Sequence, residues 1–291
     1  MSQRNAANPT LGDFLRACRA RVHPVEAGLP DDGRHRRVPG LRREELAQLA
    51  NVSVDYVVRL EQGRTANVST AVLQSLARAL RLRPDERDYL LRIAEAGAAS
   101  HAPVPHPAAS AVRPQTRTLL DGWAFPAMLL GPRLDVLAWN ALGAALLGID
   151  FGALPEEERN LVRLAFLDPR FRELYTDWRH VARECVGYLR MGMAHDPEDP
   201  QLLALVEELS TADADFRRWW SDHRVRTRAV GTKSFRHPVA GAMTLDFQSL
   251  VLGDEPDRTV FVYSAQPDTP SYEALRFLAT WSSSAPEAAR R

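Results

Sequence analysis

The chain has 291 residues, of which 45% are hydrophobic and 25% are charged, and its formal net charge is zero. This length favours two domains, and the ordinary composition excludes a fibrous or disordered protein. No apolar run reaches the roughly eighteen residues of a membrane span. The first residues lack the apolar stretch of a secretory signal. Because Cys18 and Cys185 have no partner at metal-ligand spacing, we expect a cytoplasmic protein without a metal site.

Positive charge is concentrated in the first third of the chain. Residues 11–95 contain 15 Arg and 12 acidic residues, whereas the residues from 96 onward contain 20 Arg, one Lys and 25 acidic residues. An excess of positive charge favours phosphate neutralisation. The excess is too small to establish nucleic-acid binding by itself.

Helical periodicity predicts an all-α, five-helix domain over residues 11–97. Apolar residues recur at the spacing of one helix face. Ser69 or Thr70 is placed to cap the fourth helix, while Pro84 begins the fifth and Gly97 closes it. The expected helices are Leu11–Arg21, two within residues 43–62, then 70–80 and 85–96.

Residues 42–64 have the spacing of a helix-turn-helix. Ala47 is small where the two helices would nearly touch. Asn51 occupies a turn that requires a left-handed backbone, which Asn tolerates best after Gly. Ser53 is placed to cap the second helix. The apolar contacts that fix the crossing are expected from Leu46, Ala50, Val52, Val57 and Leu60.

This stretch resembles the lambda-repressor-like, XRE-type helix-turn-helix of transcriptional regulators. The match rests on Leu46, Ala47, Asn51, Val52, Ser53, Val57, Glu61 and Gly63. The resemblance implies that Arg43 caps or contacts the backbone at the start of the first motif helix. The residues expected to bind DNA are Arg43, Ser53, Val54, Asp55, Tyr56, Arg59 and Arg64.

The second motif helix supplies the expected base contacts. Arg59 is the best candidate, because a guanidinium bridges guanine O6 and N7 at a discrimination of roughly 1–3 kcal/mol. Asp55 either accepts from cytosine N4 or filters specificity, and Val54 packs on a thymine methyl. The resemblance implies that Tyr56 and Arg64 lie near phosphates. One short helix reads few base pairs, so we expect a homodimer on a palindromic double-stranded operator.

Two further predictions concern charged residues near the motif. Glu61 follows a core position, where a carboxylate is costly unless it is paired, and Arg19 is its predicted partner. The loop carrying Arg36 and Arg37 is either a solvated charge run or a phosphate or minor-groove contact.

Composition shifts divide the remainder of the chain. Residues 98–115 are rich in Ala and Pro and have no hydrophobic face, which is typical of a linker. The expected division is a disordered N-terminus at 1–10, the helical domain at 11–97, the linker at 98–115, a second domain at 116–282 and a disordered C-terminus at 283–291.

The second domain is predicted to be α+β, with an antiparallel sheet of about five strands. Gly131 and Pro132 mark the turn of a hairpin. Helices follow, including one long helix over 172–194, and then three strands and a closing helix. In the second of these strands, residues 243–248 alternate between apolar and polar, the pattern of a half-buried strand.

Residues 112–281 resemble the ligand-binding domain of MmyB-like regulators, which are common in actinobacteria and have a PAS-like fold. The matching segments include VLAWN, ERNLVRLAFLDP, FRRWWSDHRVR, KSFRHPVAG and VYSAQPDTPSYEALRFLA. Lys233 is the only lysine of this Arg-rich chain, which is typical of a GC-rich genome. The resemblance implies a regulator that senses a small apolar ligand, with a fatty acid or similar lipid as the favoured class.

The candidate ligand residues have structural alternatives. Asn140 is placed to cap a helix, Arg163 and Arg183 to pair with acidic residues, and His237 to make a structural hydrogen bond before Pro238. The full candidate set is Trp139, Asn140, Arg163, Arg183, Tyr188 and His237.

Two other classes of function compete with the ligand sensor. In one, the second domain serves only dimerisation or protein interaction, without a small ligand. An enzyme is the least supported, because the histidines are scattered and no nucleophile, Walker-type or Rossmann-type glycine motif is present. We therefore expect no catalytic residues and no cofactor other than a bound fatty acid or lipid-like ligand.

Overall fold

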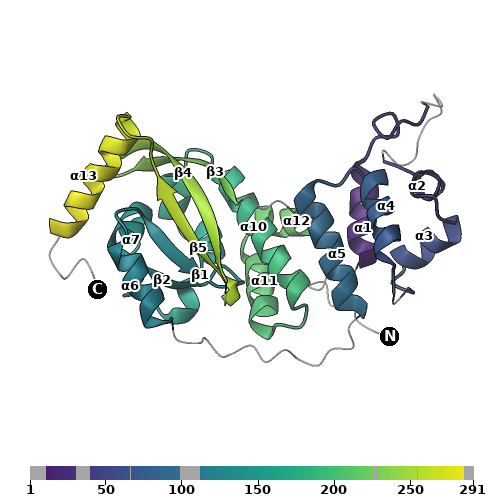
Figure 1. Cartoon of the computed structure of the whole chain (residues 1–291), viewed down its shortest axis with the longest axis horizontal. Coiled ribbons are helices and arrows are strands. Elements are labelled where there is room, and N and C mark those ends of the chain that lie inside the picture. The colour runs from purple at the N-terminus through teal and green to yellow at the C-terminus, as the bar shows by residue number, and fades with distance from the viewer. Residues whose placement is uncertain are drawn as a thin grey trace. The chain divides into compact units, whose positions relative to one another are not determined.

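The computed structural model describes residues 11–30, 40–65, 67–98, 112–225, 229–253 and 255–284. The chain forms two compact units (Figure 1). Unit 1 combines residues 1–104 with residues 190–226, and unit 2 combines residues 105–189 with residues 227–291. Within the described ranges, no helix is both long and apolar enough to cross a membrane.

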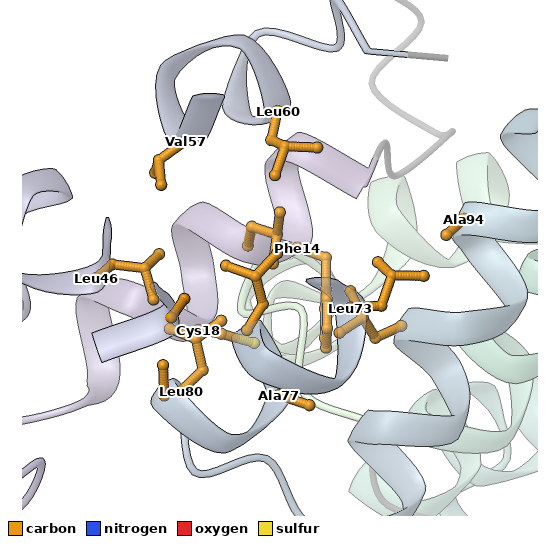
Figure 2. Close-up of a cluster of buried hydrophobic side chains, with 14 of the residues drawn as sticks. Phe14, Cys18, Leu46, Val57, Leu60, Leu73, Ala77, Leu80 and Ala94 are labelled. Atoms are coloured by element: carbon orange, nitrogen blue, oxygen red, sulfur yellow. The ribbon is translucent and has the colours of Figure 1, made fainter. Parts of the chain in front are cut away.

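Unit 1 begins with the five predicted helices, which pack around one hydrophobic core. Figure 2 shows Phe14 of the first helix near the middle of this cluster, with Leu46, Val57, Leu60 and Leu73 around it. The helices are α1 (Leu11–Arg21), α2 (Arg43–Ala50), α3 (Val54–Glu61), α4 (Thr70–Ala79) and α5 (Pro84–Ala98). The fifth helix continues through Gly97 instead of ending there.

The turn of the helix-turn-helix has the backbone that its sequence predicts. Asn51 is left-handed, with φ 54° and ψ 49°. The Ser53 hydroxyl accepts from the Tyr56 N–H at 3.1 Å, which caps α3. Gly12 of α1 lies so close to the end of α3 that a Cβ atom would stand 2.5 Å from the Glu61 carbonyl oxygen. A glycine is therefore required where α1 crosses α3.

Unit 2 is built on a five-stranded antiparallel sheet in the order β2-β1-β5-β4-β3. The strands are β1 (Ala127–Leu130), β2 (Val136–Trp139), β3 (Val230–His237), β4 (Gly241–Leu252) and β5 (Glu255–Ser264). Met243, Leu245 and Phe247 of β4 are buried while Thr244 and Gln248 are exposed, so the predicted alternation is confirmed.

The helices after residue 112 are divided between the two units. Unit 2 contains α6 (Pro114–Gly122), α7 (Ala141–Leu147), the 3₁₀ turn η1 (Glu156–Glu158), α8 (Leu161–Leu167), α9 (Pro169–Leu174), most of α10 (Trp178–His195) and α13 (Pro270–Ser284). The end of α10 belongs to unit 1, together with α11 (Pro200–Ala212) and α12 (Ala214–Ser221).

The prediction of one long helix over 172–194 was wrong, because the chain divides between α9 and α10. At the break, the Thr176 N–H donates to the Ser234 carbonyl of β3 at 2.9 Å. Asp177 accepts from the His180 N–H at 3.1 Å and so caps α10. Pairing with the sheet thus outweighs the helix propensity of the segment, and the capping Asp177 was the signal in the sequence.

Candidate DNA-binding surface and ligand cavity

The recognition helix α3 has one buried and one exposed face. Val57 and Leu60 are 1% exposed and hold the helix in the core. Val54, Asp55 and Arg59 are exposed on the other face. These three side chains are therefore free to enter a major groove, as recognition helices do with their N-terminal positions.

Arg59 and Asp55 form an ion pair on the exposed face of α3. Arg59 Nη2 lies 2.9 Å from Asp55 Oδ2, and both side chains are more than half exposed. An exposed pair of this kind contributes little to stability. It holds the guanidinium over the first turn of α3 and leaves the partners able to separate toward a base.

The other predicted DNA residues differ in their surroundings. Tyr56 is partly buried against the hydrophobic core, whereas Arg64 is exposed just beyond α3. Arg43 is exposed at the start of α2, but its Nε donates to Glu61 Oε2 at 2.7 Å. Arg36 and Arg37 lie outside the described residues.

Glu61 is the centre of a buried ion network. Its side chain is 1% exposed, and the predicted partner Arg19 is present, with Nε 2.7 Å from Oε1. Arg19 also donates from Nη1 to the Leu41 carbonyl at 2.7 Å, while Arg43 takes the second carboxylate oxygen. The network ties α1, α2 and α3 together, so Arg43 has a structural role that the motif did not predict.

Unit 2 contains a small, mainly apolar cavity of about 30 Å³. It lies between the sheet and the helices α7–α10. Its lining combines aliphatic and aromatic residues with one ion pair: Leu130, Leu134, Leu147, Leu161, Phe171, Tyr175, Val181, Glu184, Cys185, Tyr188, Lys233, Phe261 and Tyr263.

The polar part of the cavity wall is a buried ion pair. Lys233 Nζ lies 3.6 Å from Glu184 Oε2, and the two side chains are 9% and 3% exposed. The other Glu184 oxygen faces His180 Nε2 at 3.3 Å. The ammonium also stands 4.8 Å from the centre of the Phe247 ring, a cation–π contact. The wall therefore offers a fixed positive charge beside apolar side chains.

Burial sets the protonation of the other polar groups at the wall. Burial raises the pKa of the Cys185 thiol to about 11, and it raises the pKa of the Tyr175 hydroxyl well above the usual value. Both groups are therefore neutral at neutral pH. Burial alone would lower the pKa of Lys233, but Tyr263, Cys185 and Glu184 raise it above the ordinary value, so the ammonium stays charged.

Of the predicted ligand residues, only Tyr188 lines this cavity. Arg183 is exposed on α10, and Trp139 packs on Phe151 with a ring distance of 5.1 Å. The predicted residues that do not line the cavity are Trp139, Asn140, Arg163, Arg183 and His237.

Asn140 and His237 use their polar atoms inside the protein. Asn140 Oδ1 accepts from the Ala127 and Gly143 N–H groups, and its Nδ2 donates to the Leu120 and Phe125 carbonyls. This fills the hydrogen-bonding capacity of the amide. His237 Nε2 is 2.9 Å from the Ala145 carbonyl, and its Nδ1 accepts from two backbone N–H groups. The structural alternatives weighed for both residues are the ones observed.

Sequence reasoning missed Lys233 and Glu184 as wall residues. The signal was present, because Lys233 lies on the same face of β3 as the inward Phe235 and His237. Glu184 lies three residues from Val181 and four from Tyr188, on the same helix face. Lysine is almost never buried unless it is paired, so the chain's only lysine, on the buried side of a strand, requires a partner.

Comparison with known families identifies two domains in the chain. Residues 10–90 match a helix-turn-helix domain family. Residues 112–278, more than half of the chain, match the MmyB-like transcription regulator ligand binding domain. The two matches together define a ligand-responsive, DNA-binding transcription regulator. The chain belongs to the MmyB-like family. No curated protein matches the chain.

Proposed function

We propose that this regulator responds to a fatty acid or similar lipid-like amphiphile, held in the cavity of unit 2. The observation that carries the proposal is the buried Lys233 ammonium, paired with Glu184, in a mainly apolar wall. An acyl chain would contact the leucines and aromatic rings, while its carboxylate would pair with Lys233.

The charge of Lys233 is available to such a ligand because Glu184 has a second partner. Glu184 already faces His180 through its other oxygen. A ligand carboxylate that takes the place of Glu184 at Lys233 would leave Glu184 with His180. After the exchange the ligand carboxylate would be the counter-charge of Lys233, and Glu184 would keep its contact with His180 Nε2.

The cavity must widen to hold a lipid. Its volume of about 30 Å³ accommodates one water-sized group, whereas small-ligand pockets measure roughly 300–1,000 Å³. The walls on α7, α8 and α10 are side chains with several rotamers, such as Leu147, Leu161 and Tyr188. Ligand binding is therefore coupled to movement of these walls.

DNA is the partner of unit 1 in this proposal. The motif is of the XRE type, with Arg59 reading a guanine and Arg64 contacting phosphate. A homodimer binds a palindromic operator, because a single recognition helix reads too few base pairs. The site of action is the cytoplasm, where the operator is.

The ligand class is tested by extracting the protein from its native host and identifying bound molecules by native mass spectrometry. We expect a fatty acid or related lipid. Added palmitate should raise the melting temperature of the wild-type chain and leave that of Lys233→Met unchanged. Protein that carries no lipid, and whose melting temperature no lipid shifts, would contradict the proposal.

A second function, protein association through unit 2, is favoured by α13. Phe277 and Trp281 on this helix are 54% and 43% exposed. Large exposed apolar side chains mark contact surfaces when they cluster. If unit 2 serves only dimerisation, Phe277→Glu should dissociate the dimer, and lipids should have no effect on either variant or wild type.

A further inference from the structure

The core of the DNA-binding unit includes residues from the ligand-domain part of the sequence. Ala194 and Val225 are 3% and 0% exposed and belong to the same hydrophobic cluster as Phe14 and Tyr89, with Met191 packed against it. All three of these additional residues lie within the 112–278 match to the MmyB-like family. We call residues 190–225 the docking segment.

A hydrogen bond from the Arg83 side chain, just before α5, holds the end of the docking segment. Arg83 Nη2 donates to the Val225 carbonyl at 2.7 Å. The same Arg83 contacts Glu86, whose carboxylate accepts from Arg21 of α1 at 2.9 Å. The end of the segment is thus held at the start of α5, next to the junction with α1.

The other end of the docking segment contains a fully buried arginine. Arg190 is 0% exposed, and its guanidinium stands 4.2 Å from the centre of the Trp220 ring. It donates to the Trp220 carbonyl, and its Nη1 lies 3.1 Å from His223 Nδ1. Burial, followed by the Arg190 charge, lowers the pKa of His223 to about 4, so the neutral imidazole accepts this hydrogen bond.

No carboxylate among the described residues forms an ion pair with Arg190. Its neighbours are a carbonyl, a neutral imidazole, an aromatic face and the buried Tyr89 hydroxyl of α5, while the Asp222 carboxylate favours its charge electrostatically without forming an ion pair with it. A buried charge without an ion-pair partner opposes the packing around it. Arg190 therefore weakens the docking that Val225 and Ala194 favour.

The helix that carries Arg190 also forms the cavity wall. Glu184, Cys185 and Tyr188 of α10 line the cavity, and Arg190 follows Tyr188 by two residues on the same continuous helix. Widening of the cavity on its α10 side moves this wall. The buried Arg190 is thus about half a helical turn along α10 from the cavity-lining Tyr188.

We propose that the docking segment is the coupling element of the regulator: it completes the DNA-binding core, and ligand binding at the α10 wall releases it, with Arg190 keeping the docking reversible. This deepens the proposed function by assigning its regulation. Release removes Ala194 and Val225 from the core on which α3 is positioned, and so lowers operator affinity.

Docking is tested without ligand by hydrogen exchange of the full chain, read in peptides from α5. Val225→Asp places a charge at a fully buried position and should speed α5 exchange about tenfold or more. Glu207→Gln, an exposed change on α11 of the same segment, is the matched control and should have no effect. Arg190→Met, which removes the buried charge and keeps an unbranched apolar stem, should slow α5 exchange.

Unchanged α5 exchange in Val225→Asp would overturn the docking. Faster α5 exchange in Arg190→Met would show that Arg190 anchors the segment instead of weakening its hold. If Val225→Asp fails to fold, Val225→Ala, which removes only packing, should give a smaller acceleration in the same peptides, and its absence would count equally against the proposal.

Coupling is tested by adding palmitate to the wild-type chain and to Arg190→Met. In wild type, palmitate should speed α5 exchange and lower affinity for the operator duplex at least about fivefold. In Arg190→Met both effects should disappear. Palmitate that binds without changing α5 exchange overturns the coupling. Palmitate that does not bind overturns the proposed ligand class. The docking is then judged only by the ligand-free exchange measurements on the Val225 and Arg190 variants.

Discussion

Glu61 in unit 1 and Glu184 in unit 2 are both buried carboxylates with two basic partners, yet their surroundings differ. Glu61 meets Arg19 and Arg43 at 2.7 Å each, inside a packed helical core. Glu184 meets His180 at 3.3 Å and Lys233 at 3.6 Å, at the wall of a cavity. The shorter contacts use planar guanidinium groups, whereas the longer ones use an ammonium and an imidazole.

This difference separates an ion network that fixes geometry from one that can exchange partners. Guanidinium groups match a carboxylate in plane and direction, so Glu61 holds three helices in one arrangement. An ammonium is a point charge without that directional match. Two carboxylates of similar burial thus have different roles. Glu61 supports the rigid DNA-binding surface of unit 1, whereas Glu184 belongs to an ion pair at the cavity wall of unit 2 that a ligand can exchange.

The largest expected effect comes from breaking the Glu61 network. Glu61→Gln leaves Arg19 and Arg43 without their carboxylate and should destabilise unit 1 by about 3–5 kcal/mol, the usual result of removing one partner of a buried pair. Urea unfolding, followed by hydrogen exchange in α1 and α3 peptides, measures it. Glu44→Gln, an exposed change on α2, is the control. Equal stability of the two variants would refute the fixed-network interpretation.

The corresponding change in unit 2 should be milder. Lys233→Met leaves Glu184 with His180 and should destabilise unit 2 by about 2 kcal/mol, below the usual value for a buried pair. The double variant Lys233→Met, Glu184→Gln removes both charges and should recover most of this loss. Thermal unfolding of wild type, Lys233→Met, Glu184→Gln and the double variant completes the cycle. A double variant less stable than the single one would show that the pair is a structural anchor.

On the DNA surface, Arg59→Ala should weaken binding to the operator by roughly 1–3 kcal/mol and to random duplex much less. Both affinities are measured at one salt concentration. Arg92→Ala, which removes an exposed positive charge from α5, is the control. Equal losses on operator and random DNA would identify Arg59 as a phosphate contact.

The smallest effect is expected for Arg64→Ala. Loss of one phosphate contact should reduce the slope of log affinity against log salt by about 1 and leave sequence preference intact. Titrations between low and moderate salt give the slope. A changed base preference with an unchanged slope would place Arg64 in a groove.

Most of what could be predicted about unit 1 follows from the spacing of residues that are close together in the sequence. The left-handed Asn51, the Ser53 cap and the exposed Val54, Asp55 and Arg59 all depend on residues a few positions apart, where helix geometry fixes which side chains share a face. The Arg19–Glu61 pair was also predictable, because a carboxylate next to a core position needs a partner.

Contacts between segments far apart in the chain could not be predicted from the sequence. The cavity wall joins Glu184 on α10 to Lys233 on β3, and helix and strand periods alone do not bring these two elements together. The break before α10 depends on pairing with β3 in the same way. Arg163, Arg183 and His237 accordingly lie on elements that line the cavity, but of the predicted ligand residues only Tyr188 lines it.

The sequence by itself therefore determined the helix-turn-helix, the strand alternation and the family, because these follow from short-range periodicity and capping. Only the tertiary structure decided which buried charges meet, and that Arg190–Val225 packs with the DNA-binding helices. Those outcomes depend on which surfaces exclude water together, and that is a property of the folded chain as a whole.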